Sequence, residues 1–326
     1  MSASKSTAVF RERQKGMTLI ELMIAMVLGL MIILGVVSFF ITNNQTYRVN
    51  EALAKMQENA RIALEILARE IRLAGATSCV NFDLISPTVI AKPPPSGSGM
   101  HSGIAIQGFE NVTTVAGDAT TVANTDALLV SRGDECGATL TGNMTARNAN
   151  IQTYDAESCG WNAGQVLVIT DCLATDIFRA SSVSNGTSTT TVAHATNVNS
   201  ENRLSKAYDE SARVMGYRTG TYYVAIRDGE SALVVEDEAD ADPTNNPVVA
   251  DGVEDVRYLF GVDNNADGSV DSYVAAGAVG DWRDVKSVRI DIDMVSQERG
   301  LTVGVAGDGR LRRTFSRTVT VRNRTQ

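Results

Sequence analysis

One carboxylate, Glu21, interrupts a run of apolar and small residues that extends from Met17 to Ile41. As a helix this run measures roughly 37 Å at about 1.5 Å per residue, enough to cross a hydrocarbon core of about 30 Å. A carboxylate inside such a helix costs roughly 2.5–3.5 kcal/mol unless a partner neutralises it. The sequence therefore predicts that Glu21 meets a cation, yet no Lys, Arg or His lies between Met17 and Thr42.

The residues before the apolar run indicate how such a cation can arise. Residues 1–16 are basic, with a net charge of +3 from Lys5, Arg11, Arg13 and Lys15 against Glu12. This segment predicts a cytoplasmic N-terminal side, and no A-x-A-like cleavage site follows Ile41. A cut between Gly16 and Met17 would instead create an α-amino group on Met17, which supplies a partner for Glu21.

The junction "KGMTLIE" resembles the class III leader of type IV prepilins and type II secretion pseudopilins. The resemblance implies that a prepilin peptidase cuts after Gly16 and methylates the new N-terminus at Met17. It also implies that Glu21 neutralises the N-terminal amine of a neighbouring subunit during assembly. The family more often has Phe in the place of Met17, and Met is also apolar. The alternative is a plain membrane anchor with a stray acid.

A second candidate site is the loop "DNNADGSVD", residues 263–271. Its oxygen-bearing residues match the positions of an EF-hand-type calcium loop, with Gly268 at the sharp turn and the ligands Asp263, Asn265, Asp267, the Ser269 carbonyl and Asp271. Val274 stands where a bidentate Glu is expected, so another acid such as Asp281 or Asp284 would have to close the site. The alternative is an ordinary turn, because Gly, Asn and Asp make turns in any case. No cofactor is required, and calcium is the one predicted ion.

Four cysteines lie beyond the apolar run, on the predicted periplasmic side where disulfides persist. They allow three connectivities. Pairing of Cys159 with Cys172 requires the shortest loop closure, which leaves Cys79 for Cys136. The alternative is that some of them are free thiols. No CxxC pair occurs, so neither a redox pair nor a zinc knuckle is predicted.

No other pattern predicts catalysis or nucleic-acid binding. The two histidines, His101 and His194, lie in polar segments, and HExxH, GxSxG and P-loop motifs do not occur. Removing the leader's charge of +3 from the net −9 leaves −12, which argues against nucleic-acid binding. The chain is therefore predicted not to be an enzyme.

The elements that position these residues begin with a helix from Met17 to about Ala74, capped by Gly75. Its apolar half spans residues 17–41, and its amphipathic half spans 42–75, with apolar spacings of three and four at Met56, Ala60, Leu64, Leu67 and Ile71. A β-rich head follows over residues 76–326. Its clearest strand is "VKSVRIDIDMV", and residues 182–200 read as an exposed loop or hairpin. The predicted fold class is α+β, with a long N-terminal helix packed on an antiparallel head.

The segment "GVEDVRYLFGVDNNADGSVDSY" and the strands after it resemble PilW-type minor pilins, which are related to J-type minor pseudopilins. The resemblance implies assembly with other minor pilins and the major pilin, and a tip position, often with a PilY-class adhesin. It implies that the chain crosses the inner membrane once before it reaches the pilus tip. Open alternatives are a type II secretion pseudopilin and a membrane-tethered enzyme or free adhesin. Residues 100–225 match no known pattern.

Overall fold

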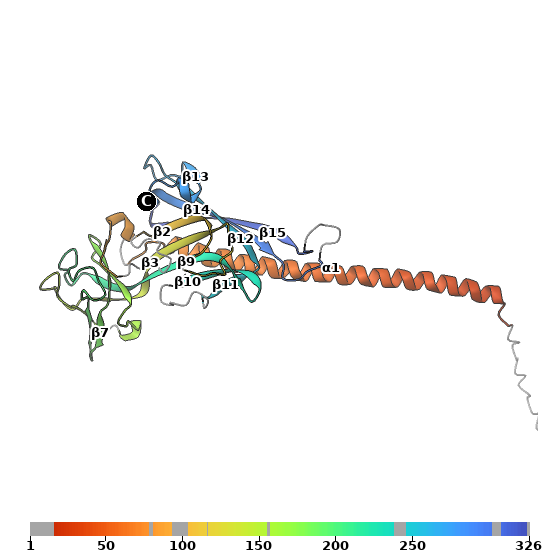
Figure 1. Ribbon diagram of the computed structural model, residues 1–326, viewed down its shortest axis with the longest axis horizontal. Helices are drawn as coiled ribbons and strands as arrows, with labels where there is room; N and C mark the ends of the chain where they lie inside the picture. The colour runs from red at the N-terminus through yellow and green to blue at the C-terminus, as the bar shows by residue number, and fades with distance from the viewer. Residues whose placement is uncertain are drawn as a thin grey trace, which may run out of the picture. The chain divides into compact units, whose positions relative to one another are not determined.

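The computed structural model describes residues 16–77, 81–92, 104–115, 117–154, 157–237, 246–301 and 308–324. The chain divides into two compact units, residues 1–51 and 52–326. Helix α1 (Leu19–Leu73) contributes residues to both units, and every described strand belongs to the second (Figure 1). Cys79, His101 and the leader residues before Gly16 lie outside the described residues.

The part of α1 in the first unit is apolar and exposed. Leu19 has 78% of its surface exposed and Phe39 has 70%, and the other large apolar side chains of residues 17–41 are exposed as well. By length and composition, α1 is the one helix in the described part of the chain that can cross a membrane. Its sequence explains the continuity, because no Pro occurs before Pro87.

The part of α1 in the second unit buries one face. The buried side chains are Ala52, Met56, Ala60, Ala63, Leu64, Leu67, Ala68 and Ile71. The predicted apolar stripe is thus confirmed, since each of its members is buried. The helix ends at Leu73, and Gly75 follows with φ +72°, the left-handed conformation typical of a helix C-terminus. A Cβ on Gly75 would lie 1.8 Å from Asn81 Oδ1, so only glycine fits there.

The second unit contains three sheets, all antiparallel apart from the β1–β6 pair. The largest has eight strands, β1 (Thr88–Val89), β2 (Ile106–Val112), β3 (Thr125–Thr139), β5 (Val166–Thr170), β6 (Thr175–Arg179), β9 (Arg213–Arg227), β10 (Glu230–Asp237) and β11 (Val248–Asp251). The second has the order β13-β12-β14-β15, with bounds β12 (Val253–Val262), β13 (Ser272–Val274), β14 (Val285–Val295) and β15 (Arg312–Thr320). The third consists of β4 (Ile151–Tyr154), β7 (Ser182–Asn185) and β8 (Thr189–Ala193). Short 3-10 helices span Phe82–Ile85, Glu157–Cys159, Ala276–Ala278, Trp282–Asp284 and Arg322–Arg324.

The main core lies between α1 and the inner faces of the two larger sheets. In β14, Val288, Ile290, Ile292 and Met294 alternate into this core, as their spacing predicts. The α+β class, with a long helix and an antiparallel head, is thereby confirmed. The predicted loop or hairpin at residues 182–200 is a hairpin of β7 and β8.

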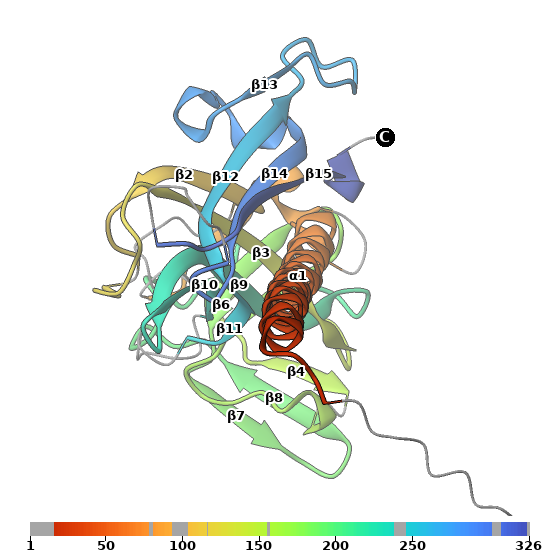
Figure 2. The same cartoon turned by 90° about the vertical axis from the view of Figure 1, so that its right-hand side faces the viewer.

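A second core lies on the other face of the large sheet. Strand β5 shows this division, because Val166 and Val168 belong to the main core while Leu167 and Ile169 belong to the second. Residues 140–165 and 180–212, which we call the outer layer, supply Ile151, Val192, Leu204 and Tyr208 to that second core. Figure 2 shows β4, β7 and β8 of this layer grouped apart from the other labelled strands.

Candidate functional site

The segment around Glu21 forms the start of helix α1. Gly16, Met17 and Thr18 precede the helix, which begins at Leu19. The Glu21 amide donates a hydrogen bond to Thr18 Oγ1 at 3.3 Å, and the Leu22 amide donates to the Thr18 carbonyl at 3.2 Å. Thr18 is therefore the N-cap, because its side chain and its carbonyl satisfy backbone amides of the first turn.

The Glu21 carboxylate has no hydrogen-bond or ion-pair partner among the described residues. It lies in the first turn of a helix whose other side chains from Met17 to Ile41 are uncharged. These side chains gain free energy only when lipid or other helices cover them, at about 25 cal/mol per Å² of apolar surface. The arrangement offers a single negative charge within a surface built for apolar contact.

The five predicted calcium ligands lie together in the loop between β12 and β13. The buried Asp263 carboxylate accepts hydrogen bonds from the amides of Asp267 at 3.2 Å and Gly268 at 2.9 Å. The Asp271 carboxylate accepts from the Asn264 amide at 2.7 Å. A hydrogen bond from the Ser269 amide, together with one from the Asn265 side chain, lowers the pKa of Asp267 below its ordinary value.

The surroundings of this loop differ from the predicted site. Lys286 Nζ lies 3.5 Å from Asp263 Oδ2 and places a positive charge beside the first predicted ligand. Asp281, a suggested closing acid, caps the 3-10 helix Trp282–Asp284 by accepting from the Arg283 amide at 2.9 Å. Across the described residues, no three His, Cys, Asp or Glu side chains are grouped so that they could hold a metal ion. Calcium binding stays a prediction.

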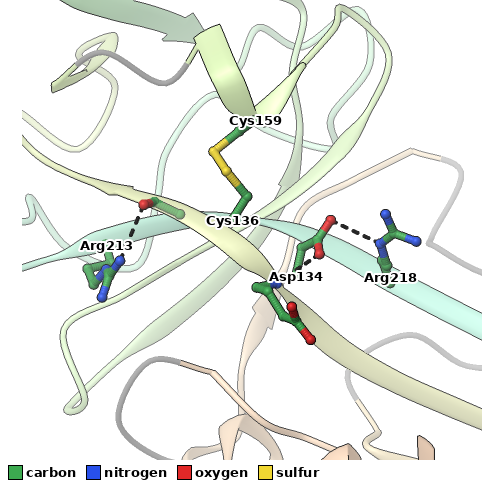
Figure 3. Close-up of a disulfide and its surroundings, with 7 residues drawn as sticks. Asp134, Cys136, Cys159, Arg213 and Arg218 are labelled. Atoms are coloured by element: carbon green, nitrogen blue, oxygen red, sulfur yellow. Dashed lines mark hydrogen bonds and ion pairs between the residues drawn. A yellow bond between two sulfur atoms is a disulfide. The ribbon is translucent and has the colours of Figure 1, made fainter.

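The predicted disulfide pairing is wrong. Cys136 of β3 is bonded to Cys159 of the 3-10 helix Glu157–Cys159, with 5.5 Å between their Cα atoms (Figure 3). Cys136 therefore cannot pair with Cys79, nor Cys159 with Cys172. Cys172 is also disulfide-bonded, while Cys79 lies outside the described residues.

The error comes from treating the residues between Cys159 and Cys172 as a flexible loop. They contain β5, an extended strand of about 17 Å at roughly 3.3 Å per residue, which is paired on both sides with β6 and β9. This strand carries Cys172 to the β5–β6 turn. Loop-closure entropy favours the shorter loop only when the intervening chain is free to close it.

Ionic contacts join β3 to β9 around the Cys136–Cys159 bond. Arg218 Nε donates to Asp134 Oδ2 at 2.9 Å, and Arg213 donates to the Gly137 carbonyl at 3.3 Å (Figure 3). The register between β3 and β9 shifts between Gly133 and Gly137, so the disulfide lies at an irregularity of the ladder. The two hydrogen bonds thus join strands within the large sheet, and the disulfide ties the outer layer to β3 through Cys159.

Two buried acidic groups were not identified from the sequence. Asp176 of β6 is fully buried and accepts hydrogen bonds from Tyr208 at 2.5 Å and from Ser205 Oγ at 2.6 Å. Asp118 is also fully buried, and Arg227 Nη2 lies 2.7 Å from its Oδ2. Burial opposes ionisation of Asp118, but hydrogen bonds from Thr120, Arg227 and Tyr223 outweigh it and lower its pKa. Because Arg227 follows Asp118 by more than a hundred residues, no local pattern joins them.

The described histidine is a structural residue. His194 is buried, its Nε2 lies 3.0 Å from the Ala149 carbonyl oxygen, and its ring contacts Phe178 edge-on. Burial lowers the pKa of His194 below its ordinary value. Within the described residues, the His194 side chain is hydrogen-bonded to a backbone carbonyl and not to a nucleophilic side chain.

Comparison with known proteins yields two family matches. Residues 11–37 match the prokaryotic N-terminal methylation motif, and residues 221–323 match the type IV pilus-assembly protein W family. Searches of curated proteins and of solved structures found no significant match. The second match covers the end of β9 and strands β10 to β15, while the outer layer lies outside it. This is a family of pilus-assembly proteins and not of enzymes. The chain thus carries a region of the type IV pilus-assembly protein W family at residues 221–323, and an N-terminal methylation motif of the prepilin kind at residues 11–37.

Proposed function

We propose that this chain is a minor pilin that primes type IV pilus assembly. The observation that carries the proposal is the Glu21 carboxylate, which has no partner among the described residues and lies in an exposed apolar helix, inside the match to the methylation motif at residues 11–37. A membrane anchor alone would gain nothing from this acid, because the charge opposes insertion. An assembly of helices uses it, since each subunit presents one acid and, after processing, one terminal amine.

The first step is hydrolysis by the prepilin peptidase. Water cleaves the Gly16–Met17 amide, leaving a carboxylate on Gly16 and an ammonium on Met17. The Met17 amine then loses a proton and takes a methyl group from an electrophilic methyl donor, which leaves as the demethylated donor. A methylated amine keeps its positive charge at neutral pH. The Met17 ammonium of one subunit then lies beside Glu21 of its neighbour, and each charge neutralises the other in an apolar environment.

The second step is recognition between heads. The head joins other minor pilins and the major pilin in a complex at the pilus tip, with a PilY-class adhesin as a further partner. In this position the protein supports adhesion and twitching motility. The support for this step is the family match over residues 221–323, which covers the sheet packed on α1.

The location follows from the same features. Before assembly the chain crosses the inner membrane once, with its basic N-terminal residues in the cytoplasm and its head in the periplasm. An oxidising compartment agrees with the disulfides at Cys136, Cys159 and Cys172. After assembly the protein lies at the pilus tip on the cell surface.

The alternative function is that of a J-type minor pseudopilin of a type II secretion system, because both classes share the leader motif. Deletion of the gene distinguishes them when surface pili are counted by electron microscopy and exported enzymes are assayed in the same strain. Loss of pili with normal export, restored by the wild-type gene, supports the priming minor pilin. Normal pili with exported enzymes trapped in the periplasm would establish the pseudopilin function instead.

A further inference from the structure

The start of helix α1 depends on a single side chain. From Met17 to Glu21, Thr18 is the one residue besides Glu21 whose side chain can accept a hydrogen bond. Its hydroxyl accepts from the Glu21 amide, and its carbonyl accepts from the Leu22 amide. The two preceding residues, Gly16 and Met17, have no helical structure. The cap therefore separates a non-helical Gly16–Met17 bond from the helix that follows it.

The alternatives to this cap would interfere with processing or with assembly. An amide without a partner is costly at the edge of an apolar segment, so a chain lacking the hydroxyl must satisfy the Glu21 amide in another way. One way is to start the helix earlier, which draws Gly16 and Met17 into the first turn. Another is to turn the Glu21 carboxylate back onto its own helix, as acids in the first turn do. An earlier helix start removes the non-helical backbone around the Gly16–Met17 bond, and proteolysis favours such backbone. A Glu21 carboxylate turned onto its own helix is no longer available to the amine of a neighbouring subunit.

We infer that Thr18 is a positioning residue for both steps. Its hydroxyl caps a helix that begins at Leu19, two residues after Met17, so that the Gly16–Met17 bond stays outside the helix and accessible to the prepilin peptidase. The same hydrogen bond satisfies the Glu21 amide, so that the Glu21 carboxylate stays free for the amine of a neighbouring subunit. This inference rests on the proposed function and adds a residue that the leader motif's Gly and Glu do not include.

The experiment measures cleavage of the full-length chain in membrane vesicles by purified prepilin peptidase, with mass spectrometry of the new N-terminus. Thr18→Val keeps the shape of the side chain and removes the acceptor. We expect its initial cleavage rate to fall about five-fold, the factor that corresponds to a cap of about 1 kcal/mol. Thr18→Ser and Thr18→Asn retain a capping oxygen, and we expect both within about two-fold of the wild-type rate.

The matched control is Thr42→Val on the same helix. The Thr42 hydroxyl donates to the Ser38 carbonyl at 2.9 Å, so the control removes a helix hydrogen bond that is not a cap. Its cleavage should equal that of the wild type. Wild-type cleavage of Thr18→Val would overturn the inference. Slow cleavage of Thr18→Asn would also overturn it, because the peptidase would then recognise the threonine side chain itself and not the capped helix start.

A second measurement, hydrogen exchange in detergent, tests the cap even if Thr18→Val inserts poorly into vesicles. Hydrogen exchange of the Glu21 amide in the detergent-solubilised full chain should be about five-fold faster in Thr18→Val than in the wild type or in Thr42→Val. Equal exchange would overturn the inference. Failure of the proposed function would look different: a chain that is no prepilin would not be cut after Gly16 even as the wild type, and a secretion pseudopilin would be cut normally but its gene deletion would leave pili intact.

Discussion

Removal of the Cys136–Cys159 disulfide should destabilise the head by an amount that its position in the chain determines. The two cysteines are separated by 23 residues. A cross-link that closes such a loop restricts the unfolded chain by about 3 kcal/mol at 25 °C. For a unit of this size, that loss corresponds to a decrease in Tm of about 6–12 °C.

The assay is urea unfolding of the detergent-solubilised full chain, with the double substitution Cys136→Ser and Cys159→Ser. Trp161 is buried in the second core and Trp282 packs against the main core, so tryptophan fluorescence follows the unfolding of both. Ser158→Ala, an exposed neighbour of the disulfide, is the matched control and should change the free energy of unfolding by less than about 0.5 kcal/mol. A loss below about 1 kcal/mol in the double variant, or a non-reduced peptide map that joins Cys159 to Cys172, would refute the reasoning.

Three further predictions concern the head. Because burial lowers the pKa of His194 in the folded state, its contribution to stability is complete above the unfolded pKa of about 6.5 and is lost as the pH falls. His194→Gln should therefore flatten the dependence of Tm on pH between about pH 7 and 5, and an unchanged slope would contradict this. Tyr208→Phe removes a hydrogen bond to the buried Asp176 carboxylate and should cost about 1.5–3 kcal/mol by urea unfolding, whereas a loss below about 0.5 kcal/mol would contradict that role. If the loop of residues 263–271 binds calcium, millimolar calcium should raise the Tm of the wild type but not that of Asp271→Asn, and equal shifts would refute the site.

Sequence patterns predict the elements of this fold well where one side of an element is buried. The spacing of Met56, Ala60 and Leu64 predicts the buried face of α1, because a helix repeats every 3.6 residues. The alternation in β14 predicts a strand with one buried face. Both signals are local, and neither depends on the partner against which the element packs.

Contacts between distant segments are not predictable in this way. The choice of Cys136 for Cys159 depends on β5 being held in the large sheet, which is a property of the whole fold. The Asp118–Arg227 pair depends on the approach of two segments that share no pattern. The Thr18 cap is the exception, since Thr-x-x-Glu before an apolar run is a helix start that the sequence itself displays.

The most direct test of the account is the incorporation of Glu21→Gln into pili. Processed protein in membranes and in sheared pili is compared by immunoblot, with Glu51→Gln, a change on the same helix beyond the apolar run, as the matched control. We expect normal cleavage after Gly16 and a loss of incorporation of about ten-fold or more, because an unpaired neighbouring amine remains in an apolar environment. The control should be incorporated like the wild type. Normal incorporation of Glu21→Gln would contradict the pairing of Glu21 with the amine of a neighbouring subunit.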